Sequence, residues 1–146
     1  MDTETHSIGL DKHAVAQLHE SLPVVVAVDD DRDSLVLLSY VVDDFPCSLV
    51  CETDGQAGLE SIISLKPDLV LLDIRLPGLS GLDIVQRLKS TPDMASMPVV
   101  AVTALAGQRY QQELLRAGFD HYICKPYELK DVQAVIQQYV FTTQLR

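Results

Sequence analysis

Short apolar runs alternate along the chain with longer stretches in which apolar residues recur every three or four positions. The short runs have the length of β-strands and fall at 24–28 (VVVAV), 47–51 (CSLVC), 69–72 (LVLL), 99–102 (VVAV) and 121–124 (HYIC). Three of them are apolar throughout, which is typical of strands buried on both faces of a sheet. The pattern therefore predicts five strands, with those three in the covered middle of a sheet.

The longer stretches have the period of amphipathic helices. The apolar residues that define them are Leu35, Leu38, Val41, Val42 and Phe45 in the first, Leu59, Ile62 and Ile63 in the second, Leu82, Val85 and Leu88 in the third, and Leu129, Val132, Val135, Ile136, Tyr139 and Val140 in the last. Residues 107–117 make a fourth, more polar helix. Five strand–helix alternations predict an α/β fold of (βα)5 type, a doubly wound five-stranded parallel sheet with helices on both faces.

Composition narrows the class of protein. The chain has 146 residues, 47% of them hydrophobic, as expected for one globular domain. Its formal charge of -10 repels phosphate backbones, so we expect no nucleic-acid partner. No apolar run approaches the ~20 residues that span a bilayer. The first 22 residues do not resemble a basic and apolar leader, so we expect a cytoplasmic protein outside the membrane, with its three cysteines as buried free thiols.

The first 22 residues form an extension before the predicted domain, which we place at residues 23–146. Within it, Leu10, Ala14, Val15 and Leu18 would share one face of a helix. This pattern fits a short helix that packs on the domain or on a partner, and it fits a flexible tail equally well.

Polar side chains follow the predicted strands where a ligand site is expected. In open α/β sheets, ligands bind beyond the carboxyl ends of the strands. The chain places there Asp29, Asp30 and Asp31 after the first strand, Asp73 after the third, Thr103 and Ala104 after the fourth, and Lys125 and Pro126 after the fifth. Two carboxylates ~4 Å apart repel by roughly 4 kcal/mol at an effective dielectric of about 20. A cation therefore belongs among these carboxylates, whereas Asp31, with Asp33, is better explained as a cap of the first helix.

Four motifs at these strand ends, taken together, resemble those of one known family. They are VDDD (28–31), LLDIRLPGLSG (71–81), VTA (102–104) and YICKP (122–126). Over about residues 23–141, the chain resembles the receiver domain of response regulators in bacterial two-component signalling. The resemblance implies a flavodoxin-like strand order of 2-1-3-4-5.

The resemblance also implies a role for each site residue. It makes Asp73 the phosphoryl acceptor and Thr103 and Lys125 the hydroxyl and ammonium that bind the phosphoryl group. Mg²⁺, or Mn²⁺, would be held by Asp29, Asp30, Asp73 and the backbone carbonyl of Arg75. The structural residues are Ala104 and Pro126, and the Lys125–Pro126 bond is expected to be cis. Tyr122 would be the aromatic switch that follows Thr103 when Asp73 is phosphorylated.

A receiver of this kind is a signalling switch rather than a metabolic enzyme, since it catalyses only its own phosphorylation and dephosphorylation. The implied donor is a sensor histidine kinase or a phosphotransfer protein. Few residues follow the last predicted helix, so we expect a single-domain regulator with output by contact with a downstream protein. A homodimer through residues 107–117, 121–124 and 129–140 is compatible with the sequence.

Three other functions remain as alternatives. A phosphohydrolase of the haloacid-dehalogenase type also uses an aspartate nucleophile with Thr, Lys and an acidic pair. In that family, however, the acidic pair comes last and a second Asp stands where this chain has Arg75. A flavin carrier would need a glycine- and hydroxyl-rich phosphate loop in place of Asp29–Asp31. A phosphorylation-independent scaffold would not require the full set of site residues.

Overall fold

The computed structural model describes residues 22–104 and 107–141, so the apolar stripe of residues 10–18 lies outside the described part. Five parallel strands form one sheet in the order β2-β1-β3-β4-β5, which confirms the predicted fold class and strand order. Their bounds are β1 (Val24–Val28), β2 (Ser48–Glu52), β3 (Leu69–Asp73), β4 (Val99–Thr103) and β5 (His121–Cys124). Strands β1, β3 and β4 are the three runs that are apolar throughout, and they occupy the middle of the sheet.

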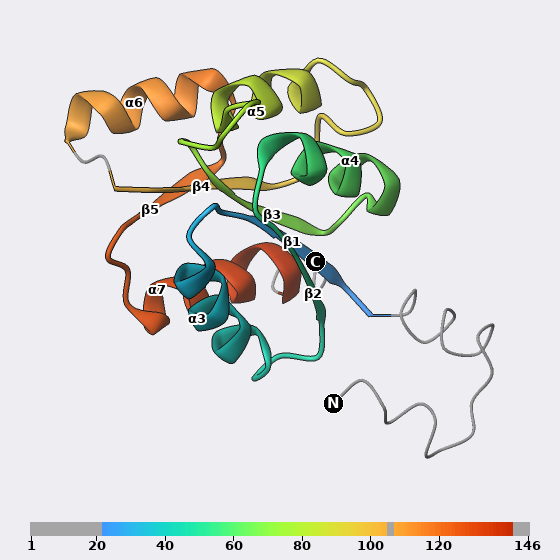
Figure 1. Ribbon diagram of the computed structural model, residues 1–146, viewed down its shortest axis with the longest axis vertical. Coiled ribbons are helices and arrows are strands. Elements are labelled where there is room, and N and C mark those ends of the chain that lie inside the picture. Colours follow the sequence, from blue (N-terminus) through green and yellow to red (C-terminus); the bar gives the residue numbers. More distant parts are fainter. Residues whose placement is uncertain (1–21, 105–106, 142–146) are drawn as a thin grey trace.

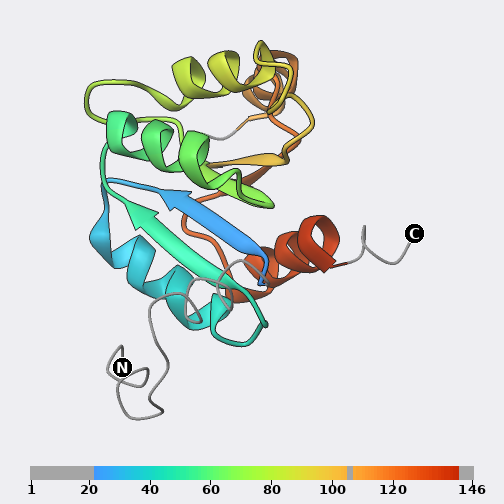
Figure 2. The ribbon, with the colours of Figure 1, turned by 90° about the vertical axis from the view of Figure 1, so that its right-hand side faces the viewer.

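Helices cover both faces of the sheet (Figure 1). On one face lie α4 (Gly55–Leu65), α5 (Gly81–Lys89) and α6 (Gln108–Ala117). On the other lie α3 (Arg32–Val42) and α7 (Leu129–Ile136), which continues into the π-helical turn η1 (Gln137–Phe141). The perpendicular view in Figure 2 separates these two helical layers from the strands between them.

Each face of the sheet has its own hydrophobic core, because neighbouring residues of a strand point to opposite faces. Val26, Leu72 and Ala101 point toward α4, α5 and α6, whereas Val25, Leu71 and Val100 point toward α3 and α7. All of β3 and β4 is buried, and this double coverage explains why their sequences lack the alternation of a half-exposed strand.

The helical stripes read from the sequence are correct in their centres and wrong at their margins. Ile63, Leu82 and Leu129 are 48%, 37% and 45% exposed, respectively. In α4 the buried face consists of Gly55, Gly58, Leu59 and Ile62, so two glycines, which no apolar pattern reveals, define where that helix meets the sheet. Phe45 lies beyond the end of α3. The second strand begins one residue later than predicted. The expectation of three buried thiols was wrong: Cys51 is exposed on this edge strand, and Cys47 and Cys124 are only half-buried.

The first residues of α3 and α5 lie at the carboxyl edge of the sheet, close to the ends of β1 and β3. Asp31 is the N-cap of α3 and accepts a hydrogen bond from the Asp33 backbone N–H, as predicted. Ser80 and Asp83 form a capping box at the start of α5. A Cβ atom at Gly81 would lie 2.3 Å from the Asp73 carbonyl oxygen. Only glycine therefore allows α5 to begin this close to the end of β3.

Candidate functional site

Four of the predicted site residues meet at the carboxyl edge of the sheet. Asp29 follows β1 and is 2% exposed, Asp73 ends β3 at 8%, and Thr103 ends β4 at 2%. Lys125 follows β5, and its backbone N–H donates a hydrogen bond to the Thr103 carbonyl at 2.7 Å. Because the strands are parallel, residues far apart in sequence arrive at the same edge with their side chains close together.

Three carboxylates form the acidic half of this site. Ligand oxygens of Asp29, Asp30 and Asp73 all lie within 4.8 Å of one another, with Asp30 exposed and the other two buried. One oxygen of Asp29 accepts the Asp31 backbone N–H at 2.9 Å. Within the described part of the chain, the other, Oδ2, is a buried side-chain oxygen that accepts no well-directed hydrogen bond. These hard carboxylate oxygens, gathered in one place, suit a divalent cation such as Mg²⁺.

Lys125 is the positive half of the site. Its Nζ lies 2.8 Å from Asp29 Oδ2 and 3.3 Å from Asp73 Oδ2. Burial alone would lower the pKa of the ammonium, but the two carboxylates outweigh it and the pKa is raised above its usual value. The Lys125–Pro126 peptide bond is cis, as expected. The ammonium therefore stays charged and is directed at both aspartates.

Asp73 is the carboxylate most affected by this environment. Burial, followed by repulsion from Asp29, raises its pKa from 3.8 to about 6. Lys125 and the backbone N–H of Arg75, which donates to Asp73 Oδ1 at 3.2 Å, act in the opposite direction. Asp73 is thus a buried carboxylate that is ionised at neutral pH and held in place by one ammonium and one amide.

The remaining predicted residues lie around this cluster. Ala104 and Pro126 are exposed beside it. Tyr122 lies on β5, outside the carboxylate cluster, and is half-buried against the α4–α6 side of the core. Its hydroxyl donates a hydrogen bond to Gln111 Oε1 of α6 at 2.8 Å.

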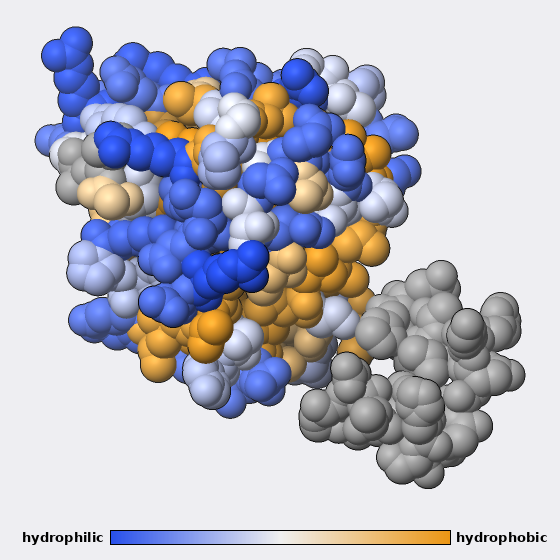
Figure 3. All heavy atoms as spheres, in the orientation of Figure 1, coloured by the Kyte–Doolittle hydropathy of each residue, from blue (hydrophilic) through white to orange (hydrophobic). Residues whose placement is uncertain are grey.

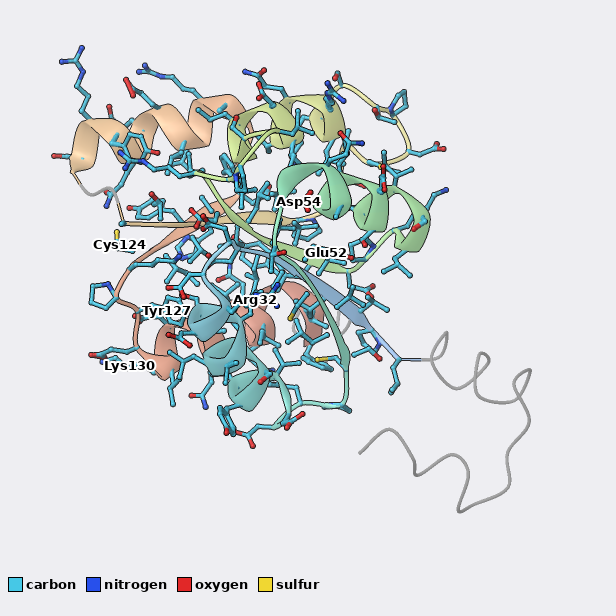
Figure 4. All side chains as sticks on the ribbon, in the orientation of Figure 1. Arg32, Glu52, Asp54, Cys124, Tyr127 and Lys130 are labelled. Atoms are coloured by element: carbon cyan, nitrogen blue, oxygen red, sulfur yellow. The ribbon has the colours of Figure 1, made fainter. Side chains whose placement is uncertain are left out.

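Sequence reasoning missed two residues that bear on the site, Gln111 and Tyr127. The Tyr127 hydroxyl donates to the Ser34 carbonyl at 3.0 Å and so ties the segment after Lys125 to the first turn of α3. Figure 4 shows Tyr127 beside that helix. Burial, with the charge of Asp29 next, raises the pKa of Tyr127, so its hydroxyl remains a donor. An aromatic residue directly after Lys125-Pro126 was a signal that could have indicated this contact.

The comparisons with known proteins agree with this geometry. The acidic cluster and the facing lysine at the carboxyl edge of a doubly wound sheet are the arrangement expected of a receiver domain. The sequence model of the response regulator receiver domain matches residues 25–137, so the chain belongs to that family, the receiver domains of two-component signalling systems. Neither the haloacid-dehalogenase nor the flavin-carrier alternative is favoured by this result.

The matched region makes up nearly all of some relatives and only a small part of others. The polar-differentiation response regulator DivK of Brucella anthropi is 28% identical over 116 residues, which are 80% of this chain and 94% of DivK. The sensor protein GacS of Pseudomonas syringae pv. syringae is 29% identical over 122 residues, 82% of this chain and 14% of GacS. The Mn²⁺-bound form of response regulator Rcp1 has a TM-score of 0.72 at 24% identity, covers 82% of this chain and 96% of Rcp1, and shows the same fold. Among the described residues, no helix combines the length and apolar character needed to cross a bilayer.

Proposed function

We propose that the chain is a phosphorylation-dependent switch in which Asp73 is the phosphoryl acceptor. The observation that carries the proposal is the convergence of Asp29, Asp30 and Lys125 on this one buried, ionised carboxylate. In the transfer, an oxygen of Asp73 bonds to phosphorus as the bond from phosphorus to the donor's histidine nitrogen breaks. The leaving imidazole then keeps the electron pair and takes up a proton.

The protein contributes position and charge to this reaction. Asp29, Asp30 and Asp73, with the Arg75 carbonyl, would hold Mg²⁺ or Mn²⁺, which when bound supplies positive charge to the phosphoryl oxygens. Lys125 adds an ammonium that contacts both Asp29 and Asp73, and the Arg75 backbone N–H orients the attacking carboxylate. A Mn²⁺-bound form of the similar regulator Rcp1 supports the choice of ion.

The output of the switch would arise at Thr103 and Tyr122. A phosphoryl group on Asp73 offers oxygens to the Thr103 hydroxyl and to Lys125, and each hydrogen bond to a charged group contributes about 1.5–3 kcal/mol. Reversing a two-state population from 1:99 to 99:1 needs about 5.5 kcal/mol. Two such bonds and an inward movement of Tyr122 are together of this size, so the α6–β5–α7 surface would change shape.

The proposed partners follow from this role. A histidine kinase or phosphotransfer protein in the cytoplasm would phosphorylate Asp73, and a downstream protein, or a second copy of the chain, would bind the α6–β5–α7 surface. The receiver domain is proposed to span residues 23–146, with residues 1–22 as an extension; the family match covers 25–137.

Intact mass spectrometry tests the acceptor role. Wild type, Asp73→Asn and Asp93→Asn would be incubated with acetyl phosphate, with Mg²⁺ or with a chelator. We expect wild type and Asp93→Asn, which changes an exposed carboxylate, to gain one phosphoryl group that hydroxylamine removes. Asp73→Asn and the chelated samples should gain none. A gain that persists in Asp73→Asn would overturn the assignment, and no gain by wild type from acetyl phosphate or from a histidine kinase would overturn the switch itself.

A further inference from the structure

The contact between β5 and α6 involves a polar pair whose role the acceptor chemistry does not explain. The Tyr122 hydroxyl donates to Gln111 Oε1 at 2.8 Å. The tyrosine is only half-buried, although its ring packs against the core on this face. Gln111 is half-buried as well, so the bond forms at the margin of the core, where water competes less than at the open surface.

Helix α6 is otherwise lightly attached to the domain. Of its ten residues Leu114 alone is buried, and Leu115 is 48% exposed. Its N-cap is Gly107, which provides no side-chain hydrogen bond to the first turn. Tyr110 and Ala117 pack half-buried against the core, and the hydrogen bond from Tyr122 adds a directed polar contact to the few that hold this helix on the sheet.

The register of the strands connects the same pair to the phosphoryl site. Tyr122 lies beside Ala101, and Cys124 lies beside Thr103. Side chains two residues apart on a strand share a face, so the Thr103 side chain and the Tyr122 ring lie on one side of the sheet, one residue pair apart. Ala101, the fully buried neighbour of Tyr122 on β4, is a small residue of the core on that same face.

We propose that Gln111 is a positioning residue that holds Tyr122 in its half-buried place and thereby opposes the rearrangement coupled to phosphorylation of Asp73. The proposal rests on the function proposed above. If the ring moves inward behind Thr103, its hydroxyl must leave Gln111. Because the hydrogen bond forms only in the half-buried position of the ring, it stabilises that position relative to the inward one. By linkage, the same bond weakens the binding of any phosphoryl group or phosphoryl mimic that favours the inward position of the ring.

A four-protein cycle tests this inference: wild type, Gln111→Leu, Tyr122→Phe and the double variant. Each single change removes one partner of the bond and keeps a side chain of similar size. The probe is beryllofluoride, a phosphoryl mimic, titrated with Mg²⁺ present and followed by ¹⁹F NMR of the bound species. Gln112→Leu is the matched control, because it places the same leucine on an exposed neighbouring position of α6. The urea midpoint of each variant monitors folding separately.

We expect Gln111→Leu and Tyr122→Phe each to tighten the apparent Kd for beryllofluoride about two- to tenfold, the factor that a hydrogen bond of ordinary strength gives. The double variant should be no tighter than the singles, because all three lack the same bond. The ring resonances of ¹³C-labelled Tyr122 should shift in Gln111→Leu toward their position in the beryllofluoride complex, and Gln112→Leu should leave both readouts unchanged.

Three results would overturn the inference: an unchanged Kd in Gln111→Leu with a normal urea midpoint, additive effects in the double variant, or equal effects from Gln112→Leu. Each of these leaves the acceptor role of Asp73 intact, because wild type still binds the mimic. Failure of wild type to bind beryllofluoride at all would instead overturn the proposed function, and this inference with it.

Discussion

Replacing Asp73 by asparagine should stabilise the metal-free protein at neutral pH, although it removes the acceptor. Burial and the charge of Asp29 raise the pKa of Asp73 from 3.8 to about 6. The folded protein therefore binds this proton more tightly than the unfolded chain does. The free energy of unfolding consequently falls as the pH rises from about 4 to about 6, and it stays reduced above that range.

The size of the effect follows from the same shift. At about 1.4 kcal/mol per pKa unit, a change of roughly two units lowers the stability of the wild type by on the order of 3 kcal/mol at neutral pH. Asparagine has nearly the same shape and no charge, so the Asp73→Asn variant avoids this cost. The loss of the ion pair with Lys125 is already included, since Lys125 contributes to the pKa of Asp73.

Urea unfolding of wild type and Asp73→Asn, in chelator at about pH 4 and at about pH 7.5, measures the difference directly. We expect the two proteins to be equally stable at the lower pH and the variant to be more stable at the higher. Added Mg²⁺ should narrow the gap, because the cation neutralises the carboxylates of the wild type. Asp93→Asn controls for the loss of an exposed carboxylate. A gap that does not depend on pH, or a less stable Asp73→Asn at the higher pH, would refute the reasoning.

Three further predictions concern other parts of the molecule. Lys89→Met should lower the free energy of unfolding by about 1–2 kcal/mol in urea unfolding, because Nζ donates to the Ala95 and Met97 carbonyls and pairs with Asp120, whose carboxylate, among the described residues, would keep only its bond from the Val99 backbone N–H. Equal midpoints would contradict this. Gly81→Ala should cost about 1–3 kcal/mol and slow phosphorylation by acetyl phosphate, because the added Cβ meets the Asp73 carbonyl; a normal rate would show that β3 can adjust. Exposed apolar side chains gather on α3 (Figure 3), which begins directly after the Asp29–Asp31 segment, so we expect the protein donor to dock on this helix. Val36→Asp should therefore reduce phosphorylation by a protein donor at least tenfold and leave acetyl phosphate unaffected; equal loss with both donors would place the defect in the site itself.

The parts of this molecule that the sequence predicted are those in which local pattern and topology agree. Asp29, Asp73, Thr103 and Lys125 each stand at the carboxyl end of a predicted strand. Parallel pairing alone is enough to bring such residues together, so their proximity could be expected before any side chain was placed. The centres of the helical stripes were correct for the same reason, since core-facing positions repeat with the helix period.

The parts that the sequence did not predict depend on contacts between specific side chains of different elements. The bonds from Tyr122 to Gln111 and from Tyr127 to the Ser34 carbonyl join residues that no periodicity relates. Ile63 is exposed because glycines, rather than large residues, mark the contact face of α4. Cys51 is exposed because β2 lies at the edge of the sheet, a position that only the strand order of the finished sheet reveals.

The light attachment of α6 has a consequence for how such a domain can diversify. Because Leu114 alone of its ten residues is buried, most positions of this helix can change without loss of the fold. Those same positions lie on the surface proposed to meet the downstream protein. Duplicated copies of the gene could therefore acquire different downstream binding partners by substitution in this one helix. The buried aspartates, and the sheet that positions them, would be inherited unchanged.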